Sequence, residues 1–522
     1  MSRPVEADAA ASARRPVPGG LRGVARGSTA NLAGAGVSAL ATLGLTMAVT
    51  HGLPRDRAGV FFATTSLFML ATTIGQLGTN TGLVYFLSRS RAMRLTGAQR
   101  LLFRTATRPV LAVALVMGVA LFVFATDLAR WINPEHVSVS ADYLRVLAVF
   151  IPLAGLENVT LAGTRGLGTM RPNVVVEQLG RPSLQLALVL LSVTVLDGRA
   201  LGLAWAFAYL PAAVLAVSWW NRLVSDDGTP AASRTADVAS LRREFWRFTS
   251  PRALASVAQM AMQRLDIVLV AALAGAVPAA LYTAATRFLV VGQMGNRAIS
   301  LAVQPRLGES LALGDLRQTR HFYQTATAWL ILVTWPMYLL FVVFGERLLA
   351  IFGRGYGAGH EVLLLLSLTM LFATACGMVD MVLNMAGRTS WNLINVALSL
   401  GVQLGVDLWL IPDHGILGAA IGWAAGIACA NVVPLLQIGL TMRLHPFGRT
   451  TGTAAVLAGG CFGLVPQAVL WVVGPGWTAV AVSVVVAGGA YAALLWRLRG
   501  TLHLTALAGL RRGRRGERED AR

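Results

Sequence analysis

Residues 324–344 read QTATAWLILVTWPMYLLFVVF and contain no charged side chain. This length suits an α-helix that crosses about 30 Å of hydrocarbon, which needs roughly 20 mostly apolar residues. Stretches of the same kind recur along the chain, separated by turn residues such as proline and glycine. We expect fourteen membrane spans, at residues 28–50, 58–86, 102–125, 144–164, 173–195, 200–220, 250–274, 278–304, 324–344, 361–384, 391–411, 415–438, 453–474 and 477–496.

The composition of the whole chain agrees with this pattern. Only 13% of the 522 residues are charged and 55% are hydrophobic, whereas soluble domains contain roughly 25% charged residues. The longest predicted outer loop, residues 126–143, contains no convincing catalytic constellation. The seven histidines lack metal-ligand spacing, and the three cysteines lie in apolar runs. The sequence therefore predicts an all-α polytopic membrane protein that is not an enzyme and holds no metal or cofactor.

All 44 basic residues are arginines, and their distribution predicts the topology. With fourteen spans, the segments on the side of the N-terminus hold 32 arginines and the opposite segments hold 7. Positive residues accumulate on the cytoplasmic side of a membrane, so both termini are expected there, in a multi-pass protein of the bacterial plasma membrane. The basic tail can lie against anionic lipid. No soluble basic module is present, and no nucleic-acid partner is expected.

The chain contains an internal repeat. Ala63 and Thr64 recur as Ala285 and Thr286, and similar offsets near 220 recur at two later turns. Six spans separate the copies, so both insert in the same orientation, related by a pseudo-twofold axis along the membrane normal. The expected organisation is an N-tail (1–27), an N-lobe of six spans (28–220), a cytoplasmic linker (221–249), a C-lobe of six spans (250–438), two further spans (439–496) and a basic C-tail (497–522).

Three stretches carry a resemblance to a known family: residues 264–267 (RLDI), 271–288 (AALAGAVPAALYTAATRF) and 411–421 (IPDHGILGAAI). They resemble the polysaccharide-transport branch, the Wzx-type flippases of lipid-linked oligosaccharides, within the multidrug/oligosaccharidyl-lipid/polysaccharide (MOP) exporter superfamily. The resemblance implies two six-helix lobes in a V, with a central cavity that opens alternately to each side of the membrane.

Polar and charged residues within the spans are the candidate site residues, because burying them in a membrane is costly. In span 250–274 several of them follow one another at spacings of three and four residues, which places them on one helical face. The residues expected to bind substrate are Arg264, Arg287, Arg297, Gln259, Gln263, Gln76 and Asp266. The candidates for ion coupling are Glu157, Asp380 and Asp407.

These residue types fit a lipid-linked sugar, since arginines pair with phosphate oxygens and amides match hydroxyl groups. A structural alternative stays open, in which Arg264 or Arg287 forms an ion pair with Asp266, Glu157 or Asp380 between packed helices. Arg297 could instead reach toward the cytoplasmic face as a topology anchor.

The expected function is an alternating-access flippase of polyprenyl-(pyro)phosphate-linked oligosaccharide, with a polysaccharide polymerase or glycosyltransferases as possible partners. Three alternative functions fit the sequence less well. A multidrug antiporter typically has a carboxylate in its first span, and residues 28–50 contain none. A lipid II flippase places several arginines in its first two spans, and none is present here. A polysaccharide polymerase or ligase generally needs a sizeable outer loop.

Overall fold

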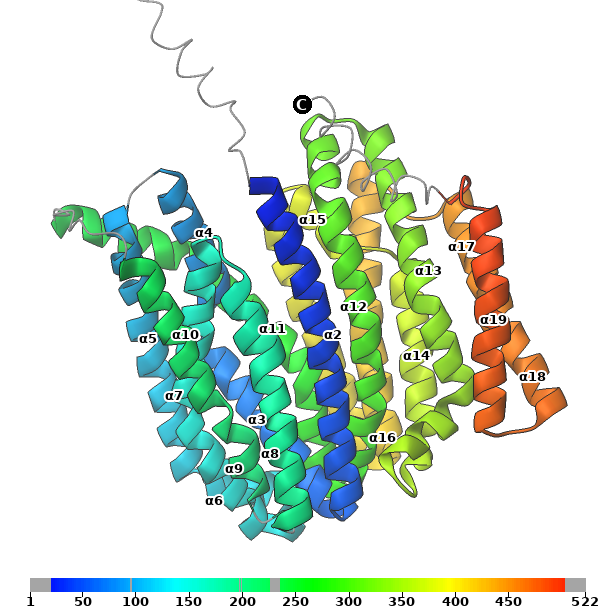
Figure 1. The fold of residues 1–522 in the computed structure, drawn as a ribbon, viewed down its shortest axis with the longest axis horizontal. Helices are drawn as coiled ribbons and strands as arrows, with labels where there is room; N and C mark the ends of the chain where they lie inside the picture. The colour runs from blue at the N-terminus through cyan, green and yellow to red at the C-terminus, as the bar shows by residue number, and fades with distance from the viewer. Residues whose placement is uncertain (1–19, 94–95, 197, 199, 226–234, 503–522) are drawn as a thin grey trace, which may run out of the picture.

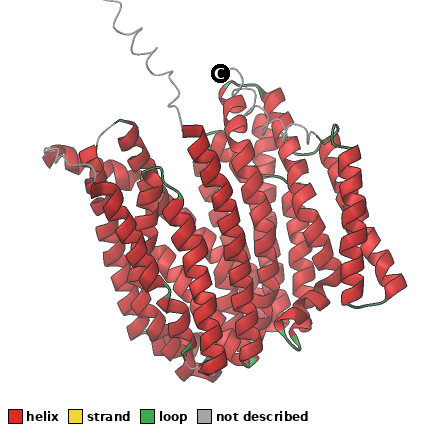
Figure 2. Cartoon of the chain, viewed as in Figure 1, coloured by secondary structure: helices red, strands yellow, loops and turns green. Residues whose placement is uncertain are grey.

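The computed structural model describes residues 20–93, 96–196, 198, 200–225 and 235–502. Within these residues the chain is almost wholly helical and has no β-strand (Figure 2). The prediction of an all-α membrane protein is confirmed. The helices run roughly antiparallel to their neighbours in sequence and form one elongated bundle (Figure 1).

In the described residues, nine α-helices, α2 to α10, make up the N-lobe together with the short helices η1 and η2. Their bounds are α2 (Gly20–Gly52), α3 (Arg55–Gly75), α4 (Thr79–Ala92), α5 (Thr96–Val123), α6 (Ala125–Ile132), η1 (Pro134–His136), α7 (Val137–Gly166), the π-helix η2 (Asn173–Gly180), α8 (Arg181–Val195), α9 (Leu201–Phe207) and α10 (Tyr209–Ser225).

The remaining helices make up the C-lobe and an appended group. The C-lobe contains α11 (Thr235–Leu273), α12 (Ala276–Ala312), α13 (Leu316–Leu349), η3 (Ala350–Phe352), η4 (Tyr356–Gly359), α14 (His360–Ala375), α15 (Val379–Met385) and α16 (Thr389–Met442). The appended group contains α17 (Arg449–Gly459), the π-helix η5 (Gly460–Leu464), α18 (Val465–Val473) and α19 (Trp477–Arg497).

The helices agree with fourteen membrane crossings. Twelve helical stretches in the described residues are long and apolar enough to span a membrane. One of them, α16, turns back at Gly415, whose φ of 55° favours glycine, and therefore contains two predicted spans. Helix α12 falls outside the twelve because only Ala276–Val290 is strongly apolar, yet its 37 residues are long enough to cross. The second span in α16 and the span in α12 raise the number of crossings from twelve to the predicted fourteen.

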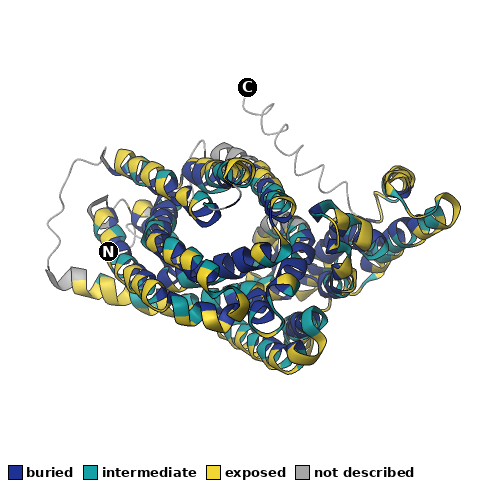
Figure 3. Cartoon of the chain, turned by 90° about the horizontal axis from the view of Figure 1, so that it is seen from below, coloured by how far each residue is buried: buried dark blue, intermediate teal, exposed yellow. Residues whose placement is uncertain are grey.

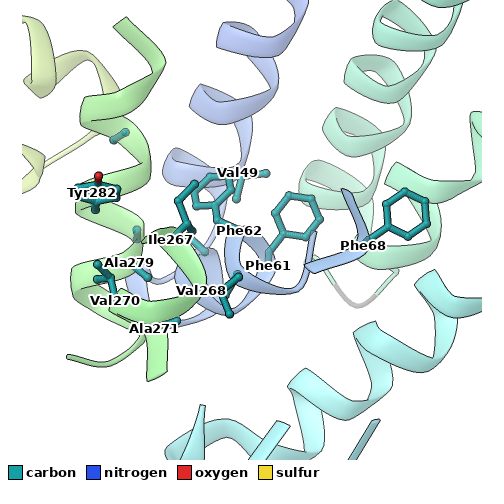
Figure 4. Close-up of a cluster of buried hydrophobic side chains, with 14 of the residues drawn as sticks. Val49, Phe61, Phe62, Phe68, Ile267, Val268, Val270, Ala271, Ala279 and Tyr282 are labelled. Carbon is teal, nitrogen blue, oxygen red and sulfur yellow. The ribbon is translucent and has the colours of Figure 1, made fainter. Parts of the chain in front are cut away.

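Hydrophobic packing closes the bundle at one end only. We call the two ends the Gly20 face and the Gly52 face, after the residues that begin and end α2. One core joins both lobes near the Gly52 face and includes Val49 and Phe61 of the N-lobe with Ile267 and Tyr282 of the C-lobe (Figure 4). Toward the Gly20 face each lobe has its own separate core, and the lobes spread apart there (Figure 1).

The closest approach between the lobes lies at the start of α3. A Cβ atom on Gly59 would collide with the backbone carbonyl oxygen of Ala276, at the start of α12. Arg55 donates a hydrogen bond of 2.5 Å from Nη2 to the carbonyl oxygen of Arg354, in the loop between η3 and η4. The lobes are therefore held in direct backbone contact at the Gly52 face.

Helix α11 passes from one lobe to the other. Near its beginning, Glu244 forms a 2.8 Å ion pair with Arg89 of α4, and Phe248 stacks on Tyr85 with ring centroids 4.4 Å apart. Near its end, the Met262 carbonyl oxygen accepts a hydrogen bond of 3.2 Å from Gln403 of α16. The predicted linker 221–249 includes the end of α10 and the beginning of α11, and its residues 226–234 lie outside the described part.

The appended helices pack on the C-lobe. Phe462 and Tyr491 share a core with residues of α13, and the Tyr491 hydroxyl donates a 2.8 Å hydrogen bond to the Leu332 carbonyl oxygen. Figure 3 shows these helices at one edge of the molecule, with exposed residues over most of their surface. Lipid can cover such a surface in a membrane protein.

Candidate functional site

The site is centred on two arginines of the C-lobe, Arg264 of α11 and Arg287 of α12. Both side chains line two adjoining cavities in the interior of the bundle. The cavities have empty volumes of about 520 and 480 Å³, including space open to solvent. Since the same two side chains border both cavities, they form the partition between them. We refer to Arg264 and Arg287 as the arginine pair.

The first cavity lies between the lobes. Apart from the arginine pair, all of its lining residues come from the N-lobe helices α2, α3, α8 and α9. They are Ala41, Thr42, Leu45, Thr46, Phe61, Phe62, Thr65, Met69, Pro182, Gln185 and Trp205.

The second cavity lies within the C-lobe. Its lining residues come from α11, α12 and α16. They are Gln263, Arg264, Asp266, Thr286, Arg287, Leu289, Val290, Gln293 and Trp423. Of the residues predicted to bind substrate, Arg264, Arg287, Gln263 and Asp266 are therefore brought together.

The arginine pair forms no direct ion pair within the described residues, although the Asp266 carboxylate lines the second cavity with it. Neither Arg264 nor Arg287 makes a hydrogen bond or ion pair with another residue in the described part of the chain, and the buried Nε of Arg287 has no partner. The expected structural alternative, an ion pair with Asp266, Glu157 or Asp380, is absent from that part. Two guanidinium groups that no carboxylate contacts directly are costly in a membrane interior unless water or a ligand solvates them. The arrangement can therefore bind an anion.

Glu157, the first candidate for ion coupling, lies beside Arg181 of the N-lobe. Glu157 of α7 has 1% of its surface exposed, and its Oε1 lies 3.3 Å from Nε of Arg181. Arg181 also donates a 2.8 Å hydrogen bond to the Tyr209 hydroxyl. A buried charge pair of this kind joins α7, α8 and α10 inside the N-lobe, so Glu157 has a structural partner.

The two aspartates near the second cavity differ in their surroundings. Asp266 accepts a 2.6 Å hydrogen bond from the Tyr282 hydroxyl and a 2.8 Å bond from the backbone N–H of Ile267. Asp407 of α16 is fully buried, and neither of its carboxylate oxygens has a hydrogen-bond partner among the residues that the structure describes. One turn earlier on α16, the Oε1 of Gln403 is also buried without a partner.

The remaining predicted residues lie away from both cavities or cannot be placed. Gln259 is exposed and lines neither cavity. Gln76 lies where α3 ends, and its Oε1 accepts a 2.7 Å hydrogen bond from Asn80. Asp380 is exposed at the beginning of α15. The side chain of Arg297 lies outside the described residues.

The polar residues predicted to share one face of span 250–274 lie in different environments. Arg252 covers the ring of Phe248, with its Cζ 3.7 Å from the ring centroid, while Asp266 is buried against Tyr282. The interpretation from the sequence did not include three polar residues of the first cavity: Thr42, Thr46 and Gln185. The spacing of Thr42 and Thr46, one helical turn apart, is the only signal that could have suggested two of them.

Comparisons with known proteins agree with this architecture. Residues 251–409 match the family model MatE, and a comparison with curated proteins finds no match. A structure described as an inward-facing multidrug resistance MATE family transporter of the MOP superfamily matches with a TM-score of 0.65 and 16% identity. The match covers 78% of this chain and 95% of the other.

Two further solved structures extend the likeness. The lipid II flippase MurJ, in an inward closed conformation, matches with a TM-score of 0.69 at 11% identity, over 90% of this chain and 99% of its own. A MOP superfamily transporter from Pyrococcus furiosus Vc1 (DSM3638), whose binding pocket is described as having reverse polarity, matches with a TM-score of 0.56 at 16% identity. That match covers 82% of this chain and 99% of the other. At these identities the likeness concerns the fold, and the chain has the fold of the MOP-superfamily transporters.

Proposed function

We propose that this protein is a MOP-superfamily transporter that flips a lipid-linked oligosaccharide across the bacterial cytoplasmic membrane. The observation that carries the proposal is the arginine pair, Arg264 and Arg287, which borders the cavity between the lobes and forms no direct ion pair within the described residues. A polyprenyl diphosphate carries several anionic oxygens, and the planar guanidinium group binds such oxygens in pairs. The sugars would occupy the cavity while the polyprenyl tail stays in lipid.

The direction of transport follows from the distribution of arginines. The excess of arginine on the side of the termini assigns the Gly20 face to the cytoplasm. The lobes are separate at that face and share an apolar core at the other, so this state would accept substrate from the inner leaflet. A shift to the opposite arrangement of the lobes, with no bond chemistry, would release it outside.

Coupling to an ion gradient is proposed for the C-lobe. Of the three carboxylates considered for this role, Asp407 is buried without a hydrogen-bond partner, Glu157 has Arg181 beside it, and Asp380 is exposed. A buried carboxylate without a hydrogen-bond partner is high in free energy when it is charged. Binding of a proton or a monovalent cation at Asp407 would lower that free energy. Asp266 and Gln403 are the neighbours that could share this ion.

A lipid II flippase is the second candidate. It is favoured by the match to MurJ over 90% of this chain, and lipid II carries the same diphosphate group. A multidrug–cation antiporter fits less well, because the arginine pair would repel a cation and residues 28–50 contain no carboxylate. Anionic lipids at the cytoplasmic face, and a polymerase or glycosyltransferases of the same route, remain proposed partners.

The proposal can be tested with purified full-length protein in liposomes. A fluorescent polyprenyl-diphosphate-linked oligosaccharide and fluorescent lipid II are each incorporated, and a membrane-impermeant quencher reports the fraction in the outer leaflet. We expect rapid exchange of the oligosaccharide lipid and slower exchange of lipid II. The reverse order would support the second candidate, and exchange of neither lipid would refute a flippase of this class.

A further inference from the structure

The appended helices carry a concave site of their own, away from both cavities. An apolar groove with an empty volume of about 780 Å³, including the space open to its surroundings, lies between α17 with η5 and the end of α19. We call it the appended groove. None of its residues lines the cavities that contain the arginine pair. They are Gly452, Thr453, Val456, Leu457, Gly460, Cys461, Leu494 and Leu498.

Glycine residues make the appended groove concave. A Cβ atom added to Gly452 or to Gly460 would meet no other atom within 4 Å, so each glycine leaves open space beside its helix. The side chains of Leu457 and Cys461 are buried and form the floor of this space. Val456, at the rim, is 77% exposed. The groove is therefore open to the surrounding lipid.

The lining and the length of the appended groove suit an apolar chain. The hydroxyl of its polar lining residue, Thr453, donates a 2.8 Å hydrogen bond to the Arg449 carbonyl oxygen, so it has no proton left to donate. From Gly452 to Cys461 the groove extends for about 13 Å at 1.5 Å per residue. One leaflet supplies about 15 Å of hydrocarbon, half of the membrane core. The groove thus matches an acyl chain of one leaflet, whereas a membrane-spanning helix of a partner would need about twice that length.

Arginines lie at the Gly20 face on both helices that line the groove. Arg449, the first residue of α17, precedes Gly452 and Thr453 by three and four positions. Arg497, the last residue of α19, follows Leu494 by three positions. Residues three or four apart share one helical face, so both arginines lie on the faces that line the groove. We call Arg449 and Arg497 the groove arginines.

The appended helices contain no carboxylate that could neutralise the groove arginines. The sequence has no Asp or Glu between Asp413 and Glu517. Both groove arginines are exposed, and neither forms an ion pair with any residue that the structure describes. Trp496, beside Arg497, is 71% exposed, and exposed tryptophans are typical of the headgroup level of a membrane. The groove therefore begins at a cationic site among the headgroups and continues into hydrocarbon.

We propose that the appended groove binds a glycerophospholipid with an anionic headgroup, in the leaflet at the Gly20 face. Its phosphate contacts the groove arginines, one acyl chain lies along α17, and the lipid bridges α17 and α19. The groove lies at the edge of the molecule, away from the arginine pair (Figure 3). The bound lipid is therefore a resident component and not the transported substrate. The site goes beyond the proposed function, because it would bind this lipid whichever substrate the transporter moves.

The test measures lipid binding to the full-length protein in detergent by native mass spectrometry. The probes are phosphatidylglycerol, which is anionic, and phosphatidylcholine with identical acyl chains, which has no net charge. An arginine at a membrane surface contributes about 5-fold to the affinity for an anionic lipid. The two groove arginines should therefore bind one phosphatidylglycerol molecule roughly 25-fold more tightly than phosphatidylcholine.

Charge variants locate the headgroup. The double variant Arg449→Gln with Arg497→Gln should lose the preference for phosphatidylglycerol at this site. The control is the double variant Arg222→Gln with Arg243→Gln, which removes the same charge from exposed positions of α10 and α11. It should keep the preference.

A second pair of variants locates the acyl chain. Gly452→Leu fills the appended groove without changing its charge and should weaken the binding of phosphatidylglycerol. Gly488→Leu of α19 is the control, because an added Cβ also meets open space there and the residue does not line the groove. It should bind phosphatidylglycerol like the wild type. Equal thermal unfolding temperatures without added lipid would show that all variants are folded.

Three results would overturn the inference. The groove arginines hold no headgroup if the wild type binds both phospholipids equally, or if their double variant keeps the preference. The groove belongs to the transported lipid if a short polyprenyl diphosphate displaces phosphatidylglycerol from a variant that carries Arg264→Gln and Arg287→Gln. It is an interface between copies of the chain if Gly452→Leu converts a wild-type dimer into a monomer. The liposome assay of lipid exchange decides the proposed function separately, so the two proposals can fail independently.

Discussion

Thr65 of α3 and Arg287 of α12 line the same cavity from opposite lobes. The internal repeat aligns these two positions, 222 residues apart, so the pseudo-twofold relation brings equivalent residues to one space. One copy carries a small hydroxyl and the other a guanidinium group. The two matching positions of the repeat therefore present different chemistry to one cavity.

The arginine pair should be needed for transport. Replacing Arg264 or Arg287 singly with glutamine removes a charge-assisted contact to an anionic headgroup, and a hydrogen bond to a charged group contributes about 1.5–3 kcal/mol. We expect the affinity for a polyprenyl diphosphate lipid to fall about 10- to 100-fold, with slower exchange in liposomes at equal expression. Arg306→Gln, an exposed arginine further along α12, is the control. Normal transport by both cavity variants would mean that these arginines serve the structure only.

The Glu157–Arg181 pair should contribute to stability. Glu157→Leu leaves the Arg181 guanidinium without its carboxylate in a buried position, which typically costs about 3–5 kcal/mol. We expect a clear fall in the thermal unfolding temperature of the detergent-purified protein. The comparison is Asp142→Asn, which breaks an exposed pair with Arg145 at 3.5 Å and should change little. Unchanged stability with lost ion dependence in Glu157→Leu would instead assign Glu157 to coupling.

The backbone contact at Gly59 should hold the lobes closed at the Gly52 face. Gly59→Ala adds a methyl group that collides with the Ala276 carbonyl oxygen, so the state described here should lose population. With the three native cysteines replaced, spin labels at Arg57 and Arg347, both exposed near this face, should report longer distances. Gly452→Ala, where an added Cβ has open space, is the matched control. An unchanged distance distribution in Gly59→Ala would show that the contact relaxes locally.

Asp407 should link transport to an ion. Asp407→Asn removes the ionisable group while keeping its size, so transport should lose its dependence on an imposed proton or sodium gradient. Asp380→Asn changes an exposed carboxylate of the same lobe and should keep that dependence. Flux is measured in liposomes with each gradient applied in turn. A gradient response that survives in Asp407→Asn would move the coupling site elsewhere.

Much of the fold could be predicted because membrane spans are long and carry a strong signal. The fourteen spans follow from uninterrupted apolar runs, which require helices because lipid offers no hydrogen-bond partners. Finer features could not be derived in this way. One example is the packing of α11 on α4 through Glu244 and Phe248, a contact between residues distant in sequence.

Only those site residues whose burial in a membrane costs the most free energy could be predicted from the sequence. Arg264 and Arg287 stand out because a charge within an apolar span demands an explanation. Gln76 lines neither cavity. The sequence predicts one continuous span over 58–86, whereas the chain breaks at Leu77 and Gly78, which both have positive φ. Thr42 and Thr46, which line the first cavity, gave little signal, since a threonine bonded to its own helix is common in any span.

The attachment of α17, α18 and α19 to α13 has a mechanical consequence. These helices enlarge the membrane footprint of the C-lobe, and a wider body moves against more viscous drag in the bilayer. When the lobes rock against each other, the narrower N-lobe should therefore cover most of the distance. The C-lobe, with the arginine pair, would act as the nearly stationary partner around which the N-lobe moves.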